Sequence, residues 1–130
     1  MIIHPQHYFP SEVDDLVRAS DWARNPDALF IIYKIDNDKR LDLESINVIN
    51  YIINEHFYSV LFTRLNNNSV DGLASSTPVN PDDNSDTMML QLTINVIHMA
   101  LKEGYYCQLF DNQTAFFNWV ITMKMTPKIN

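Results

Sequence analysis

Two stretches of the chain show apolar residues at the spacing of an amphipathic helix. Residues 11–24 do so behind Ser11, which suits the capping position, and Asp14, whose side chain reaches back toward the first turn. Residues 87–104 do so over several turns and end at Gly104, a residue that favours helix termination. Both stretches are therefore predicted to be helices.

Three shorter stretches also carry patterns of secondary structure. Residues 26–35 begin with Pro26 and Asp27, which favour a helix start, but continue into bulky apolar residues that also suit a buried strand. The helix is the favoured interpretation there. Residues 105–110 are strand-like, and residues 111–124 are predicted to form a final helix behind a capping Asp or Asn.

Residues 41–65 form the longest apolar-rich stretch. Ile46, Ile49 and Ile53 fit one side of a helix, and further apolar residues spread around its circumference. A helix in the centre of the fold is therefore expected. Residues 56–65 also fit a strand.

The next stretch, residues 66–86, is polar and has few bulky apolar side chains, so a long surface loop is expected there. Together the elements predict one domain over residues 1–130. We expect it to be mainly α, with about four to five helices and at most one or two short strands. The alternative is an α+β fold with strands near residues 28–35 and 105–110.

The composition narrows the classes of function. The chain has 130 residues and two glycines, Gly72 and Gly104, which lie too far apart for a phosphate-binding loop, a dinucleotide fingerprint or a serine-hydrolase elbow. No spacing of nucleophiles, bases or carboxylates singles out a catalytic set. We therefore expect that the protein is not an enzyme and needs no cofactor.

The charge balance indicates a protein partner. Nine basic and sixteen acidic residues give a formal net charge of −7, which disfavours direct nucleic-acid binding because phosphate contacts need Lys and Arg. An acidic protein suits a basic partner, which its field attracts. The single cysteine, Cys107, the lack of a visible secretory signal and the short apolar runs predict a cytoplasmic protein without a membrane contact.

The segment YKIDNDKRLDLESI, residues 33–46, spaces its acidic residues almost as a calcium-binding loop does. With Leu41 at the apolar position of such a loop, Asp36 and Asp38 occupy two ligand positions and Asp42 a later one. In this spacing the segment resembles an EF-hand. The resemblance implies a helix before the loop and another after it.

Three positions depart from the EF-hand pattern. Lys34 stands where the first carboxylate belongs, Lys39 where the turn needs glycine, and Ser45 where a bidentate glutamate belongs. We therefore interpret the segment as an acidic turn that leads into a helix, not as a metal site. The four histidines lack the paired spacing of a zinc signature, so no metal site is predicted elsewhere.

The expected function is that of a small acidic, non-catalytic protein that covers a basic partner protein. Immunity proteins against basic toxins, phage-encoded inhibitors of host defence nucleases and secretion chaperones act in this way. Acidic side chains would steer the partner, and aromatic side chains would anchor it. The expected acidic contacts are Asp36, Asp38, Asp42 and Glu44, and the expected aromatic contacts are Tyr105, Tyr106, Phe117 and Trp119.

Two alternatives accompany this expectation. One is a degenerate EF-hand-like module built on the acidic segment. The other is a structural or assembly protein in which an apolar helix within residues 46–61 forms a homodimer.

Overall fold

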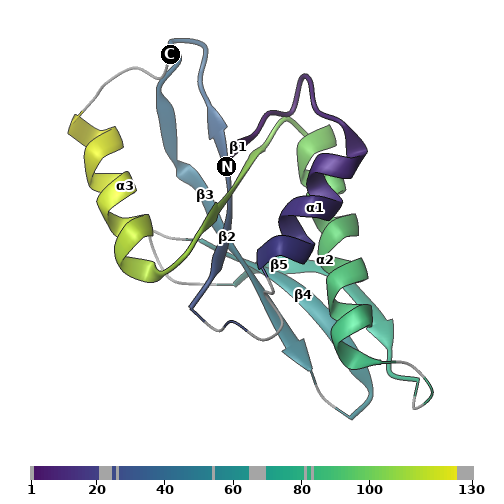
Figure 1. Ribbon diagram of the computed structural model, residues 1–130. Coiled ribbons are helices and arrows are strands. Elements are labelled where there is room, and N and C mark those ends of the chain that lie inside the picture. The colour runs from purple at the N-terminus through teal and green to yellow at the C-terminus, as the bar shows by residue number, and fades with distance from the viewer. Residues whose placement is uncertain are drawn as a thin grey trace.

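The computed structural model describes residues 2–20, 25, 27–53, 55–64, 70–80, 82 and 84–125. These residues form six strands and three helices, and the strands make one antiparallel sheet in the order β1-β6-β2-β3-β4-β5 (Figure 1). The elements follow in the order β1 (Ile2–Ile3), α1 (Pro10–Ser20), β2 (Leu29–Ile35), β3 (Leu41–Ile53), β4 (Phe57–Arg64), β5 (Val70–Pro78), α2 (Ser85–Lys102), β6 (Tyr106–Phe110) and α3 (Gln113–Met125).

Helices lie on both faces of the sheet. Along β2, Phe30 and Ile32 belong to the core beneath α1 and α2, whereas Ile31 and Tyr33 belong to a second core beneath α3. This division follows from the strand itself, because successive side chains point to opposite faces. Figure 1 shows α1 and α2 on one side of the sheet and α3 on the other. The central strands are therefore buried on both faces.

The first predicted helix is present as α1, and it begins at Pro10, whose fixed φ suits a first turn. The Glu12 carboxylate accepts a hydrogen bond from the backbone N–H of Phe9 at 3.3 Å. The N–H of Glu12 donates to the Phe9 carbonyl at 2.9 Å. Ser11, expected as the cap, lies inside the helix. Residues 21–24 of the predicted helix lie outside the described residues.

The helix predicted over residues 87–104 is confirmed as α2. Asn84 caps it, because its side chain accepts a hydrogen bond from the N–H of Thr87 at 3.2 Å. Gly104 ends it with a φ of 91°, and the N–H of Tyr105 donates to the Ala100 carbonyl at 3.0 Å. None of the helices in the described part of the chain combines the length and the apolar character that a bilayer crossing requires.

The C-terminal elements also follow the prediction. Residues 105–110, read as strand-like, contain β6. The final helix is α3, and the Asn112 side chain caps it by accepting a hydrogen bond from the N–H of Ala115 at 2.8 Å.

The prediction of a mainly helical domain is wrong. Residues 26–35 and 41–65, both favoured as helices, contain β2, β3 and β4 instead. The fold is α+β: the two strands of the alternative are present as β2 and β6, within a sheet larger than the alternative foresaw. The apolar helix proposed for a homodimer does not exist, because residues 46–53 belong to β3 and residues 57–61 to β4.

The polar stretch of residues 66–86 is not one long loop. It contains β5, which pairs with β4 along the edge of the sheet, and it ends in the first turn of α2. Residues 65–69, 81 and 83 lie outside the described residues. β5 was overlooked because small and polar residues dominate its sequence and give no strand pattern.

Candidate functional site

A hairpin joins β2 to β3, and Asp36 organises its turn. The Oδ1 atom of Asp36 accepts hydrogen bonds from the backbone N–H groups of Asp38 and Arg40, each at 2.9 Å. The backbone closes the same turn, because the N–H of Asp36 donates to the Arg40 carbonyl at 2.9 Å and that of Lys39 to the Asp36 carbonyl at 3.0 Å. Lys39 has a φ of 60°, a conformation that glycine adopts more easily. The acidic tip is therefore a tightly bonded turn.

Ser45 connects the two strands of the hairpin where their register shifts. The shift lies between Ile32 and Lys34 of β2 and leaves extra residues in β3. The Ser45 hydroxyl accepts a hydrogen bond from the N–H of Lys34 at 2.7 Å and donates one to the Asp42 carbonyl at 2.6 Å. The bulge thus keeps its polar backbone groups bonded and fixes the direction in which the hairpin leaves the sheet.

The four acidic residues predicted as partner contacts all lie on this hairpin. Asp36 uses one carboxylate oxygen to bind the backbone of the turn, and Asp42 uses one to accept a hydrogen bond from the N–H of Glu44 in β3 at 3.1 Å. The Nζ atom of Lys34 lies 4.8 Å from the centroid of the Tyr105 ring, which directs this cation toward the sheet. All four acidic side chains are exposed: Asp36, Asp38, Asp42 and Glu44.

The acidic segment is not the loop of a helix–loop–helix. Strands β2 and β3 flank it, so the helices expected on either side are wrong. Among the described residues, no group of three or more His, Cys, Asp or Glu side chains comes together to hold a metal ion. Instead, the Asp36 carboxylate binds the backbone of the turn, and the Asp42 carboxylate binds the backbone of β3.

The segment between β1 and α1 exposes a large aromatic ring. Phe9 is 72% exposed, more than any other large apolar side chain in the described part of the chain. It borders an open surface pocket of about 370 Å³ together with His7, Tyr8 and Glu12. Because Glu12 and Pro10 hold the backbone of Phe9 at the start of α1, the ring stands on an ordered support.

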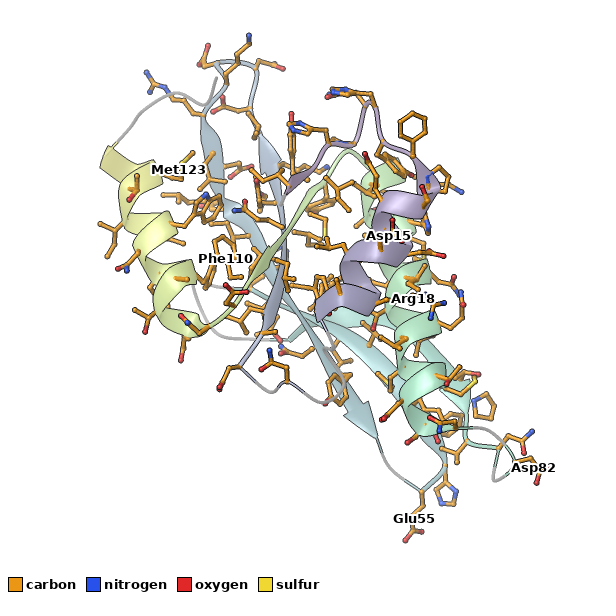
Figure 2. All side chains as sticks on the ribbon, in the orientation of Figure 1. Asp15, Arg18, Glu55, Asp82, Phe110 and Met123 are labelled. Atoms are coloured by element: carbon orange, nitrogen blue, oxygen red, sulfur yellow. The ribbon has the colours of Figure 1, made fainter. Side chains whose placement is uncertain are left out.

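This N-terminal segment and the acidic hairpin leave the same end of the sheet. β6 lies between β1 and β2, and its first residue, Tyr106, pairs with Tyr33 near the end of β2. The ring of His4, just after β1, meets the Tyr106 ring edge-on at 5.2 Å between centroids. Neighbouring strands lie about 4.8 Å apart, so the two segments begin roughly 10 Å from each other. In Figure 2 this end is at the top, opposite Glu55 and Asp82.

The four predicted aromatic contacts differ in exposure. Tyr105, Tyr106 and Trp119 are half-buried. Tyr106 stacks on Tyr33 with centroids 5.6 Å apart, and Trp119 packs on the same Tyr33 ring at 5.0 Å. Phe117 is 42% exposed, and its ring lies beside that of Phe116 with centroids 5.5 Å apart. The half-buried rings contribute to the two cores, and Phe117 offers a free surface.

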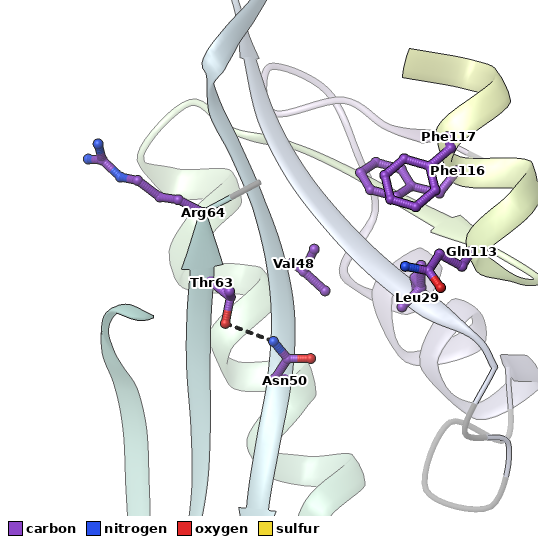
Figure 3. Close-up of a pocket in the computed structure, with 8 residues that line it drawn as sticks. All are labelled: Leu29, Val48, Asn50, Thr63, Arg64, Gln113, Phe116 and Phe117. Atoms are coloured by element: carbon purple, nitrogen blue, oxygen red, sulfur yellow. Dashed lines mark hydrogen bonds between the residues drawn. The ribbon is translucent and has the colours of Figure 1, made fainter. Parts of the chain in front are cut away.

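A groove of about 210 Å³ lies between α3 and the sheet (Figure 3). Phe116 and Phe117 form its wall on the side of α3, and Val48 of β3 points toward them. On the sheet, the Asn50 side-chain N–H donates to the Thr63 hydroxyl at 2.8 Å. The other lining residues are Leu29, Gln113 and Arg64, of which Arg64 points away from the rest in Figure 3.

Two buried groups have shifted acidities. Burial raises the pKa of the Cys107 thiol to about 12, so the reactive thiolate is scarce at neutral pH. Burial, with Cys107 and Tyr106 as smaller causes, raises the pKa of Tyr33 above its usual range. The Tyr33 hydroxyl donates to the Gln108 Oε1 atom at 3.0 Å. Both groups are therefore neutral members of the core at neutral pH.

The sequence interpretation missed two exposed residues, Phe9 and Ile121. Phe9 stands between Tyr8 and Pro10 in a segment without periodicity, so nothing in the pattern indicates which ring is exposed. Ile121 is 56% exposed and follows Phe117 by four residues. That spacing places both on one side of a helix and was present in the sequence.

In comparisons with protein-family models, with curated proteins and with solved structures, nothing matched the chain.

Proposed function

We propose that this protein is a small, non-catalytic binding module that covers a basic partner protein and blocks its surface. Immunity proteins, phage-encoded inhibitors of defence nucleases and secretion chaperones are proteins of this kind. The observation that supports the proposal is the exposed Phe9 ring at the same end of the sheet as the acidic hairpin. An aromatic anchor at the same end of the sheet as exposed carboxylates suits a partner pocket bordered by Lys and Arg.

In this mechanism the charge acts on association and the aromatic ring on dissociation. The chain's net charge of −7 attracts a basic protein from a distance. The hairpin itself carries four acidic and three basic residues between Lys34 and Ser45, so its own balance is only −1. The exposed carboxylates of Asp38 and Glu44 then pair with cations of the partner, while Phe9 fills an apolar pocket and slows release.

The compartment that we propose is the cytoplasm. The one cysteine, Cys107, is buried as a free thiol, which suits a protein that works in a reducing environment. A partner would accordingly be a basic protein of the same compartment.

The first experiment separates charge from turn structure. Asp38→Asn and Glu44→Gln together remove two charges without removing the carboxylate oxygens that Asp36 and Asp42 give to the hairpin backbone. Glu55→Gln with Asp82→Asn removes the same charge from the opposite end of the molecule (Figure 2). The wild type and both variants are immobilised and exposed to lysate of the source cells. Proteins that the wild type and the Glu55/Asp82 variant retain, but the Asp38/Glu44 variant does not, are then identified.

The purified partner is then tested directly. We expect a basic protein whose association slows roughly tenfold or more as salt rises, and whose dissociation speeds up about tenfold with Phe9→Ala. An acidic partner, an association rate insensitive to salt, or equal capture by all three proteins would show that the proposal is wrong. Circular dichroism of each variant confirms that the fold is retained.

A further inference from the structure

The helix α3 is apolar on both of its sides. Phe116 and Val120 are buried against the sheet, while Phe117 and Ile121 are 42% and 56% exposed on the outside. The two exposed residues are four positions apart, which places them about 6 Å from each other along one side of the helix. They form a short apolar ridge that no described part of the chain covers.

The groove of Figure 3 lies directly beside this ridge. Phe117 belongs to both, because it lines the groove with Phe116 and also stands at one end of the ridge. Ridge and groove therefore share one surface of the molecule. Such a surface suits a contact around a two-fold axis, in which each copy offers the same residues to the other.

The charges on this surface indicate which kind of molecule can bind to it. Residues 113–123 of α3 contain no charged side chain, and the described lining of the groove contains one cation, Arg64, and no carboxylate. A basic partner finds nothing here to pair with its cations. Two copies with a net charge of −7 each repel one another over most orientations, and a surface without carboxylates is where they approach at the lowest electrostatic cost.

We infer that two copies of this chain associate through α3, with the two helices antiparallel around a two-fold axis near residue 119. In this arrangement the Phe117 ring of each copy packs against Ile121 of the other. The helix of one copy then lies along the groove of the other, and packed helices approach to about 8–10 Å between axes. The inference does not depend on the proposed basic partner, which uses the other exposed surface.

The dimer is expected to be weak and reversible. A helix of 13 residues is about 20 Å long, so the contact is small beside the roughly 800 Å² per copy of a standard interface. We therefore expect a Kd on the order of 10 µM. Added salt should tighten it, because salt screens the repulsion between two acidic copies. This salt response is opposite to that of the proposed basic partner.

Sedimentation velocity of the wild-type chain from about 2 to about 200 µM, around the expected Kd, tests the inference. We expect a monomer at the lowest concentration and mostly dimer at the highest. Phe117→Ser with Ile121→Ser should remain monomeric throughout. Phe117→Leu, which keeps an apolar ridge, should still dimerise and shows that the loss is not caused by misfolding.

Phe57→Ser and Met99→Ser provide the matched control. Both residues are exposed to a similar degree, 46% and 48%, but lie on β4 and α2. Their double variant should dimerise as the wild type does. A monomeric wild type at the highest concentration would overturn the inference, and so would a dimer that survives the Phe117/Ile121 change or that weakens with salt.

Discussion

The carboxylate of Asp36 accepts a hydrogen bond from the backbone N–H of Arg40 at 2.9 Å and so closes the turn between β2 and β3. Replacing Asp36 by Ala removes this acceptor and is expected to cost about 1 kcal/mol of unfolding free energy. Asp36→Asn keeps an oxygen acceptor and should cost less than about half of that. Urea unfolding measures both. Equal losses for the two variants would mean that the charge, not the turn, is what matters.

A substitution at Lys39, in the same turn, is expected to raise the stability of the fold. The φ of 60° at Lys39 is strained for a side chain with a Cβ atom and relaxed for glycine. We expect Lys39→Gly to raise the unfolding free energy by roughly 0.5–1 kcal/mol, although it increases the entropy of the unfolded chain. Lys39→Ala removes the same charge without relieving the backbone and should give no gain. A thermal melt of the two variants side by side distinguishes these outcomes.

Neighbouring phenylalanines of α3 should behave very differently. Phe116 is 2% exposed and packs on Phe110 with ring centroids 5.4 Å apart, whereas Phe117 is 42% exposed. Phe116→Ala is expected to cost about 3–5 kcal/mol because it leaves a cavity. Phe117→Ala should cost less than about 1 kcal/mol in the monomer. Urea titrations at low protein concentration give both values, and similar losses would contradict the exposed position of Phe117.

Alkaline pH should weaken the fold through Cys107. Burial raises the pKa of this thiol from 9.0 to about 12, so the folded state keeps a proton that the unfolded state releases. Stability is therefore complete below pH 9 and declines as the pH rises toward 12, by up to about 1.4 kcal/mol per pH unit. Tyr33 adds to the decline above pH 10, because its pKa is also raised by burial.

Urea unfolding at a series of pH values measures this decline. Cys107→Ala removes the thiol and should give a shallower slope between pH 9 and 12, with some loss of stability at pH 7 from the small cavity. A slope unchanged by Cys107→Ala would assign the decline to other groups.

The helix α2 could be predicted because its apolar residues recur at helical spacing along one side. Met89, Leu92, Val96, Ile97 and Ala100 were expected on one side, and all five are buried. Gly104 also fixed its end. Local spacing sufficed here because the helix is long and because glycine marks the stop in the sequence itself.

The strands β3 and β4 could not be recognised in the same way. Ile46 faces the α3 core and Ile49 the core beneath α1 and α2, so both faces of β3 are apolar and the alternation that marks a strand is lost. In the sequence, Ile46, Ile49 and Ile53 follow one another at spacings of three and four residues, which is also the spacing of a helix. The turn between the strands contains neither glycine nor proline to interrupt that pattern.

The candidate site was predictable in part. A turn at Asp36 and Asp38 could be predicted because Asp and Asn side chains favour turns, whereas the helices expected on both sides of it are strands. The position of Phe9 at the same end of the sheet as these acidic residues could not be predicted. It follows from the register between β1, β6 and β2, and register is a property of the assembled sheet.

The register shift held by Ser45 separates two parts of the chain that tolerate change differently. Below it, β2 and β3 are bound to both cores, and a shift of one residue would turn every side chain to the wrong face. Beyond it, the extra residues of β3 are absorbed locally, so the tip can lose, gain or exchange residues while the scaffold stays in place. The tip of the hairpin can therefore vary in length and sequence independently of the sheet that supports it.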